Sequence, residues 1–198
     1  MMTTLNTMAV GADGIIRDIK VSVEITEGVG IHVVNMSDAG VKEMLLRVVT
    51  ALTAIRYRIP GKKIVIAFSE EVTGMFSLAD AAVAIGLLIA SGQVRPAIDY
   101  RSDSFAGELT LDGSIRVPDA LHRCGCDGCN LEESHCSEGC ADRRDLVRYG
   151  LVDWLMHVIP EGMDDYLALN TDHPSLARNS LRDIVSMLEA PENCNTKI

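Results

Sequence analysis

Alternation of hydrophobic and polar residues predicts several strands along the chain. Residues 19–25 alternate strictly, and residues 31–36 continue the strand pattern after a glycine-containing turn. Residues 62–68 form an apolar run that is typical of a buried strand. Farther along, residues 105–117 contain two strand-like runs joined by the dipeptide Asp112-Gly113, which favours positive φ and therefore predicts a tight hairpin.

Helical spacing appears in three other places. Apolar residues recur at helical intervals over 41–55, with Ser37 placed to cap the start of the helix. A second, almost entirely apolar segment follows Ser77 and Asp80, whose spacing resembles a capping box. A helix that is apolar on nearly all sides belongs in the interior, packed between other elements. The segment 180–189 has the pattern of a closing amphipathic helix, so the order of elements predicts a compact α/β domain.

Composition and charge limit the possible classes of protein. A chain of 198 residues can bury one core of its own, and its net charge of −10 opposes direct binding to nucleic acid or anionic lipid. The basic residues that follow the first helix are better explained by the negative end of the helix dipole than by DNA contact. These residues are Arg56, Arg58, Lys62 and Lys63. The longest apolar run, residues 78–90, is too short to span a bilayer, and the start of the chain lacks a targeting pattern. We therefore expect a soluble, cytoplasmic protein.

A cluster of cysteines is the strongest chemical signal in the sequence. Five of the six cysteines and one histidine fall within residues 124–140, CGCDGCNLEESHCSEGC. Thiolates in two close pairs can hold a tetrahedral zinc ion, and the predicted ligands are Cys126, Cys129, Cys136 and Cys140. Cys124 and His135 are spare ligands, and spacing alone does not choose among the six. We favour a structural zinc over disulfides, an iron–sulfur cluster or free thiols, because tight cysteine clusters in reducing compartments are more often metal sites.

Several stretches together resemble the Lon-protease-like domain that precedes the ATPase module in magnesium-chelatase-related ATPases of the competence type. The matching stretches are residues 21–68, 80–94 (DAAVAIGLLIASGQV), 107–117 (GELTLDGSIRV), 158–169 (VIPEGMDDYLAL) and 180–189 (SLRDIVSMLE). The resemblance implies a two-layer α/β fold shared with Lon peptidase domains, and an adjacent AAA+ module. That module's Walker A motif is absent from this sequence, because GKK at 61–63 lacks both the preceding glycine and the following hydroxyl. The domain is therefore expected to be stand-alone and unable to hydrolyse ATP.

The same resemblance implies that the Lon peptidase dyad is missing. Lon peptidases use a serine nucleophile and a lysine base, and the lysine must lie desolvated within hydrogen-bond reach of the serine. The resemblance places Leu78 at the serine position, with Ser77 one residue before it, and places the lysine position near Cys124. No lysine occurs between Lys63 and Lys197. We therefore expect no catalytic residues and no peptidase activity of the Lon kind.

The sequence thus predicts a single Lon-like, magnesium-chelatase-related domain over residues 1–198. It should carry a Cys-rich, metal-binding insertion at 123–142 and a closing helix at about 180–189. We expect a non-catalytic interaction or adaptor module whose protein partner is an AAA+ ATPase or a second copy of the chain, with no membrane and no direct nucleic-acid binding. The alternative is a hydrolase with a rearranged active site around Ser77 and His122.

Overall fold

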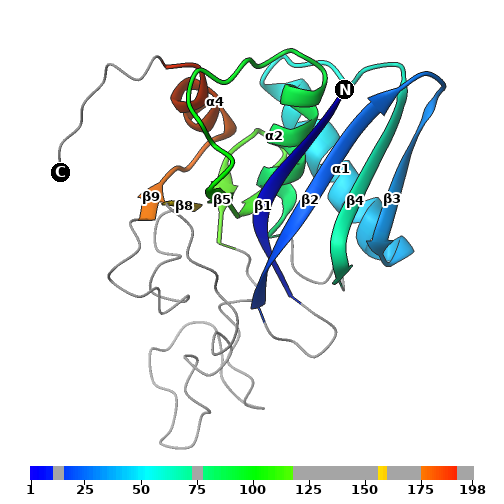
Figure 1. Ribbon diagram of the computed structural model, residues 1–198, viewed down its shortest axis with the longest axis horizontal. Helices are drawn as coiled ribbons and strands as arrows, with labels where there is room; N and C mark the ends of the chain where they lie inside the picture. Colours follow the sequence, from blue (N-terminus) through cyan, green and yellow to red (C-terminus); the bar gives the residue numbers. More distant parts are fainter. Residues whose placement is uncertain (11–15, 73–77, 118–155, 160–174, 191–198) are drawn as a thin grey trace, which may run out of the picture.

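A mixed sheet forms the centre of the domain. The computed structural model describes residues 1–10, 16–72, 78–117, 156–159 and 175–190. Within these residues the sheet has seven strands in the order β3-β4-β2-β1-β5-β8-β9, and a separate hairpin pairs β6 with β7 (Figure 1). The strands are β1 (Met2–Val10), β2 (Ile16–Thr26), β3 (Gly30–Met36), β4 (Lys63–Val72), β5 (Asp103–Phe105), β6 (Glu108–Leu109), β7 (Ile115–Arg116), β8 (Met156–Ile159) and β9 (Ser175–Ala177). The helices are α1 (Asp38–Ala54), α2 (Asp80–Ala90) and α4 (Leu181–Glu189).

The helices pack on one face of the sheet, and the alternation in β2 shows why. Val21 and Val23 are fully buried, whereas Lys20 and Glu24, which point to the opposite face, are exposed. In Figure 1, α1 and α2 lie behind β1, β2 and β4. β2 pairs antiparallel with both β1 and β4, while β3 pairs parallel with β4, so the sheet is mixed. The predicted α/β class is confirmed.

Helix α2 lies at the centre of the core. All of its residues, from Asp80 to Ala90, are buried, as its apolar composition predicts. It lies so close to β1 and β2 that a Cβ atom on Gly86 would come within 2.7 Å of Val23 Cγ2 and 3.2 Å of Leu5 Cδ1. Glycine at this position therefore sets the distance between the helix and the sheet.

Strand β1 is the longest element that the hydrophobic pattern does not reveal. It lies between β2 and β5, and three of its polar residues are buried. Each has a specific hydrogen bond: the hydroxyls of Thr3 and Tyr100 are 3.0 Å apart, Asn6 Nδ2 donates to the carbonyl of Asp103 at 3.1 Å, and Thr7 Oγ1 donates to the carbonyl of Phe105 at 2.7 Å. Because these bonds satisfy the buried polar groups, a strand rich in Thr and Asn can occupy the interior.

The helix starts test the predicted caps. Ser37 caps α1, where its hydroxyl accepts a backbone N–H of the first turn at 3.4 Å, and Ser180 caps α4 in the same way at 3.2 Å. The predicted capping box of Ser77 and Asp80 is wrong. The N-cap position of α2 is held by Ala79, without a side-chain hydrogen bond, and the carboxylate of Asp80 has other partners.

Three other expectations concern the membrane, the insertion and the closing helix. Among the helices of the described residues, none combines the length and the apolar character needed to cross a membrane. The predicted Cys-rich insertion at 123–142 falls within residues 118–155, outside the described residues. The closing helix is confirmed as α4, with its buried side chains on one face.

Candidate functional site

A buried carboxylate at the start of α2 is the centre of the candidate site. Asp80 is 1% exposed and lies in the first turn of the helix. Its Oδ2 accepts a hydrogen bond from Arg47 Nε at 2.6 Å and one from the backbone N–H of Leu109 at 3.3 Å, while Oδ1 lies 3.4 Å from Arg47 Nη2. A carboxylate at this position also benefits from the positive end of the helix dipole. The contacts join α1, α2 and β6 around one charged group.

The backbone brings these partners together. Arg47 comes from the middle of α1, which packs against α2, whereas Leu109 comes from the hairpin strand β6. The segment before β6 is fixed to the start of α2, because the N–H of Gly107 donates to the carbonyl of Leu78 at 2.7 Å and its carbonyl accepts from the N–H of Ala81 at 3.3 Å. These two backbone bonds place the Leu109 amide beside Asp80.

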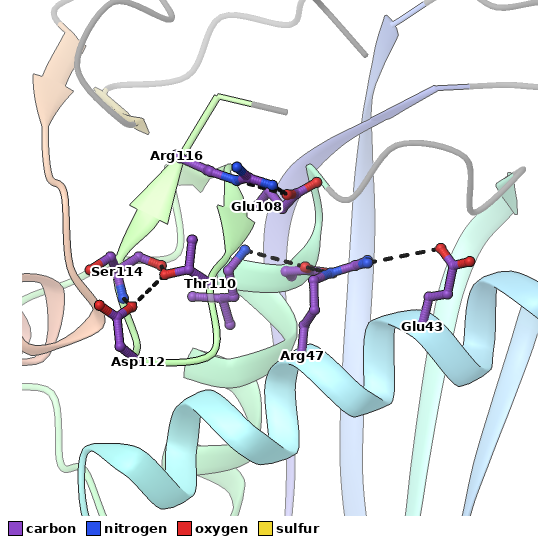
Figure 2. Close-up of polar contacts among 9 residues, drawn as sticks. Glu43, Arg47, Glu108, Thr110, Asp112, Ser114 and Arg116 are labelled. Carbon is purple, nitrogen blue, oxygen red and sulfur yellow. Dashed lines mark hydrogen bonds and ion pairs between the residues drawn. The ribbon is translucent and has the colours of Figure 1, made fainter. Parts of the chain in front are cut away.

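A second ion pair, between Arg116 and Glu108, lies near the first. Glu108 lies opposite Arg116 in the β6-β7 register, and Arg116 Nη2 is 2.6 Å from Glu108 Oε1 (Figure 2). Arg47 also lies 3.9 Å from Glu43, one turn earlier on α1. The side chain of Glu108 is mostly buried, while those of Arg116 and Glu43 are largely exposed. The charges of the site are thus buried at Asp80, partly buried at Arg47 and largely exposed at Arg116 and Glu43.

The hairpin turn is held by its own polar contacts. The carboxylate of Asp112 accepts hydrogen bonds from the Thr110 hydroxyl and from the backbone N–H of Ser114, the latter at 3.0 Å (Figure 2). These hydrogen bonds lower the pKa of Asp112 below its usual range. Gly113 has φ +91°, as the predicted Asp-Gly turn requires, and a Cβ atom there would come within 2.6 Å of Ile55 Cγ2 in the residue that ends α1. The predicted hairpin is confirmed.

Helix α4 closes over the hairpin through backbone bonds. The N–H of Leu181 donates to the carbonyl of Gly113 at 3.0 Å, and the N–H of Ile115 donates to the carbonyl of Asn179 at 2.8 Å. At the other end of α4, the carbonyl of Leu188 accepts from the N–H of Ala97 at 2.7 Å. The hairpin therefore lies between α1, α2 and α4, and its position depends on all three.

Burial controls the protonation of the central pair. Desolvation raises the pKa of Asp80 to about 7, although the hydrogen bond and the charge of Arg47 oppose the shift and the nearby Glu108 adds to it. Burial acts to lower the pKa of Arg47, but its hydrogen bond and charge interaction with Asp80 leave that pKa above its usual value. Because Asp80 is almost fully buried and already accepts hydrogen bonds on both oxygens, the arrangement is that of a structural ion pair rather than of a general base.

The predicted metal ligands and the two residues of the alternative hydrolase lie outside the described residues. Residues 73–77 and 118–155 are outside the described part of the chain. Those ranges contain Ser77, His122, Cys124, Cys126, Cys129, His135, Cys136 and Cys140. The described residues contain no group of three or more His, Cys, Asp or Glu side chains that could hold a metal ion. The zinc site therefore stays a prediction.

The sequence does contain a signal for the Arg47–Asp80 pair, although the capping interpretation missed it. Asp80 is the only charged residue of α2, and Arg47 falls between the buried Met44 and Val48 of α1. Charged residues in such positions are rarely buried unless they are paired. Each residue therefore suggests an oppositely charged partner, and the fold supplies it from a segment 33 residues away.

Comparison with known proteins identifies one family. A family model described as subunit ChlI of magnesium chelatase matches residues 21–124. The match spans more than half of the chain and includes Arg47, Asp80 and the hairpin. It ends before the two cysteine pairs of the predicted zinc site. No curated protein matches the chain.

The buried carboxyl predicts an unusual dependence of stability on pH. The pKa of Asp80 is raised from an ordinary value near 4 to about 7, so the folded state binds this proton more tightly than the unfolded state. The stabilisation that the protonated Asp80 carboxyl contributes is complete below about pH 4 and is lost as the pH rises through about 7. Relative to the variant Asp80→Asn, the wild type should lose about 2–4 kcal/mol of unfolding free energy over this range. Urea denaturation of both chains at pH 4 to 8 measures the difference.

The variant Asp112→Asn is the matched control, because hydrogen bonds lower the pKa of that exposed carboxylate. Relative to Asp112→Asn, the wild type should gain unfolding free energy as the pH rises through the acid range, which is opposite to the change expected for Asp80. A wild type that gains stability relative to Asp80→Asn between pH 4 and pH 7 would show that pairing with Arg47 outweighs desolvation at Asp80.

Proposed function

Because the chain belongs to the family of magnesium-chelatase ChlI subunits, we propose that it is a non-catalytic, Lon-like domain of this family that serves as an interaction module for an AAA+ ATPase. The observation that carries the proposal is the burial of Leu78. This residue stands where the resemblance to Lon peptidases places the nucleophile, and it is fully buried. An aliphatic side chain has no proton to give and no atom with which to attack a carbonyl.

The surroundings of Leu78 support the same proposal. Its carbonyl accepts the Gly107 N–H, and the N–H of Ala81 in the first turn of α2 is bonded to the Gly107 carbonyl. Backbone groups at the start of a helix are suitable donors for an oxyanion, but this donor already has a partner. The carboxylate of Asp80, two residues after Leu78, is bound to Arg47. Among the residues that the structure describes, Leu78 therefore offers no nucleophile, and the Asp80 carboxylate and the Ala81 N–H beside it already have partners.

The proposal includes a protein partner, and the resemblance to domains that work beside an AAA+ module supports it. The 198 residues include no Walker A motif, whereas the Lon-like domains that the chain resembles work beside an AAA+ module. An AAA+ ATPase that binds this domain would restore that pairing. Self-association is the second candidate, in keeping with the ring packing of Lon-like domains.

The proposal includes a structural zinc knuckle. Two thiolate pairs, Cys126 with Cys129 and Cys136 with Cys140, would supply four ligands, and a closed four-thiolate site favours structure over catalysis. The metal would fix an excursion of the chain without a large apolar core and would contribute directly to its folding. The arginines that follow the knuckle would offer a basic docking surface, and they are Arg143, Arg144 and Arg148.

The alternative is a hydrolase that uses Ser77 as nucleophile and His122 as base. A fluorophosphonate probe distinguishes the two functions, because it labels only serines that a base activates. We expect no labelling of the full chain and no hydrolysis of casein or of ester substrates. The variant Ser77→Ala serves as the control. Labelling of the wild type that disappears in Ser77→Ala would replace the interaction module with the hydrolase.

Metal content and partner capture test the remaining parts of the proposal together. Protein purified without chelators should contain about one zinc ion per chain. The double variant Cys126→Ser/Cys129→Ser should lose the metal, whereas Cys194→Ser, which removes the cysteine outside the cluster, should keep it. Elemental analysis of the three chains gives the result.

The same three chains can serve as baits, crosslinked in the cells that produce them and analysed by mass spectrometry. The wild type and Cys194→Ser should recover an AAA+ ATPase, and the double cysteine variant should recover less of it. Absence of metal from the wild type would remove the knuckle from the proposal. Zinc without any AAA+ ATPase among the crosslinked proteins would contradict the adaptor role.

A further inference from the structure

Strand β3 forms one edge of the sheet. Within the described residues only β4 pairs with it, and its other side faces outward (Figure 1). The strand carries no lysine, arginine or carboxylate, and its one titratable side chain is the exposed His32. Val34 is 45% exposed, and Val29, just before the strand, is 80% exposed. Soluble proteins usually protect such edges with charges, so a long uncharged edge is competent to pair with another strand.

A bulge limits the part of the edge that can pair. Residues 30–34 lie in regular register with β4, and the register shifts between Val34 and Met36. Asn35, inside the shift, has φ 65°, and its Nδ2 donates to the carbonyl of Phe68 at 2.7 Å. This side-chain bond anchors the bulge to β4. The regular outer edge is therefore the five residues from Gly30 to Val34.

We propose that this edge pairs antiparallel with the same edge of a second copy of the chain, around a two-fold axis at His32. This register places Ile31 opposite Val33 of the second copy on the helix-covered face and leaves both bulges outside the ladder. Ile31 and Val33 pack against the core but remain only half-buried, so apolar cross-strand pairs would complete their burial. On the other face, His32 lies opposite His32 of the second copy.

The charges around β3 favour a second copy of the chain as the binding partner of this edge. They are basic beside Gly30 and acidic beside Met36, as the register with β4 shows. The basic end carries Lys62 and Lys63, and the acidic end carries Asp38, Glu70 and Glu71. Glu27 at the basic end and Lys20 and Lys42 near the acidic end reduce this polarity without reversing it. An antiparallel pair of identical edges brings the basic end of each copy to the acidic end of the other, whereas a parallel pair would bring like charges together.

Distance decides what these charges contribute. β4 of one copy would lie two strand spacings, about 10 Å, from β3 of the other copy. This is close to one Debye length at moderate ionic strength, so the charges orient the two edges more than they bind them. The five-residue ladder and its apolar pairs supply the attraction, and the expected dimer is weak and dependent on concentration. The inference does not rest on the proposed function, because neither the knuckle nor an ATPase takes part.

Sedimentation equilibrium of the full chain tests the dimer. The wild type should show a monomer–dimer equilibrium, and Val34→Lys should raise the dissociation constant about tenfold or more, because it adds two charged edge residues to each dimer. The matched control is Leu111→Lys, which adds the same charge at a similarly exposed apolar residue of the hairpin turn and should leave the constant unchanged. Circular dichroism checks that each variant is folded.

The register itself can be tested with opposite charges at position 32. Chains carrying His32→Lys or His32→Glu should each be more monomeric than the wild type, because like charges would meet across the axis. An equimolar mixture of the two should form heterodimers that native mass spectrometry detects. A wild type that stays monomeric at every concentration, equal weakening by Val34→Lys and Leu111→Lys, or a mixture that forms no heterodimer would overturn the proposal.

Discussion

The structure depends on how one buried carboxylate is neutralised. Asp80 lies at the start of an otherwise apolar helix, where an unpaired charge would cost several kcal/mol. Arg47 and the Leu109 amide satisfy it, and in doing so they fix α1 and the β6-β7 hairpin against α2. The hairpin in turn accepts the first backbone bond of α4 at Gly113. A network of this kind stabilises little beyond a hydrophobic replacement, but loss of one partner would remove a large share of a typical stability of about 5–15 kcal/mol.

Much of the fold can be predicted from the sequence, because most of its elements have a regular period. Alternation in β2, helical spacing in α1 and α4, the uniform apolarity of α2 and the Asp-Gly turn each correspond to an observed element. Strand β1 could not be predicted in this way. Its buried Thr3, Asn6 and Thr7 are acceptable only because of hydrogen bonds to residues about 100 positions away, and no local pattern records such partners. The Arg47–Asp80 pair was missed for the same reason, since a short-range capping rule also fits Asp80.

The proposed function rests on the residue that stands where the resemblance to Lon peptidases places the nucleophile. In this member of the ChlI family a buried leucine, a closed pair of backbone bonds and a neutralised carboxylate surround the start of α2. The proposed function is that of a domain that presents surfaces to other proteins. Two such surfaces are proposed. The zinc knuckle is argued from cysteine spacing alone, whereas the β3 edge is argued from register, exposure and charge.

The central claim is that Asp80 and Arg47 stabilise the domain as a pair, and a double-mutant cycle at about pH 8 tests it most directly. In the wild-type background, Arg47→Met should cost about 1–2 kcal/mol of unfolding free energy, because Asp80, whose pKa is already about 7, then loses its cation and takes up a proton. In the Asp80→Asn background, where the amide can still accept the Leu109 N–H, the same substitution should cost less, which gives a coupling energy of about 1 kcal/mol. Equal costs in the two backgrounds, and hence a coupling energy near zero, would contradict the account.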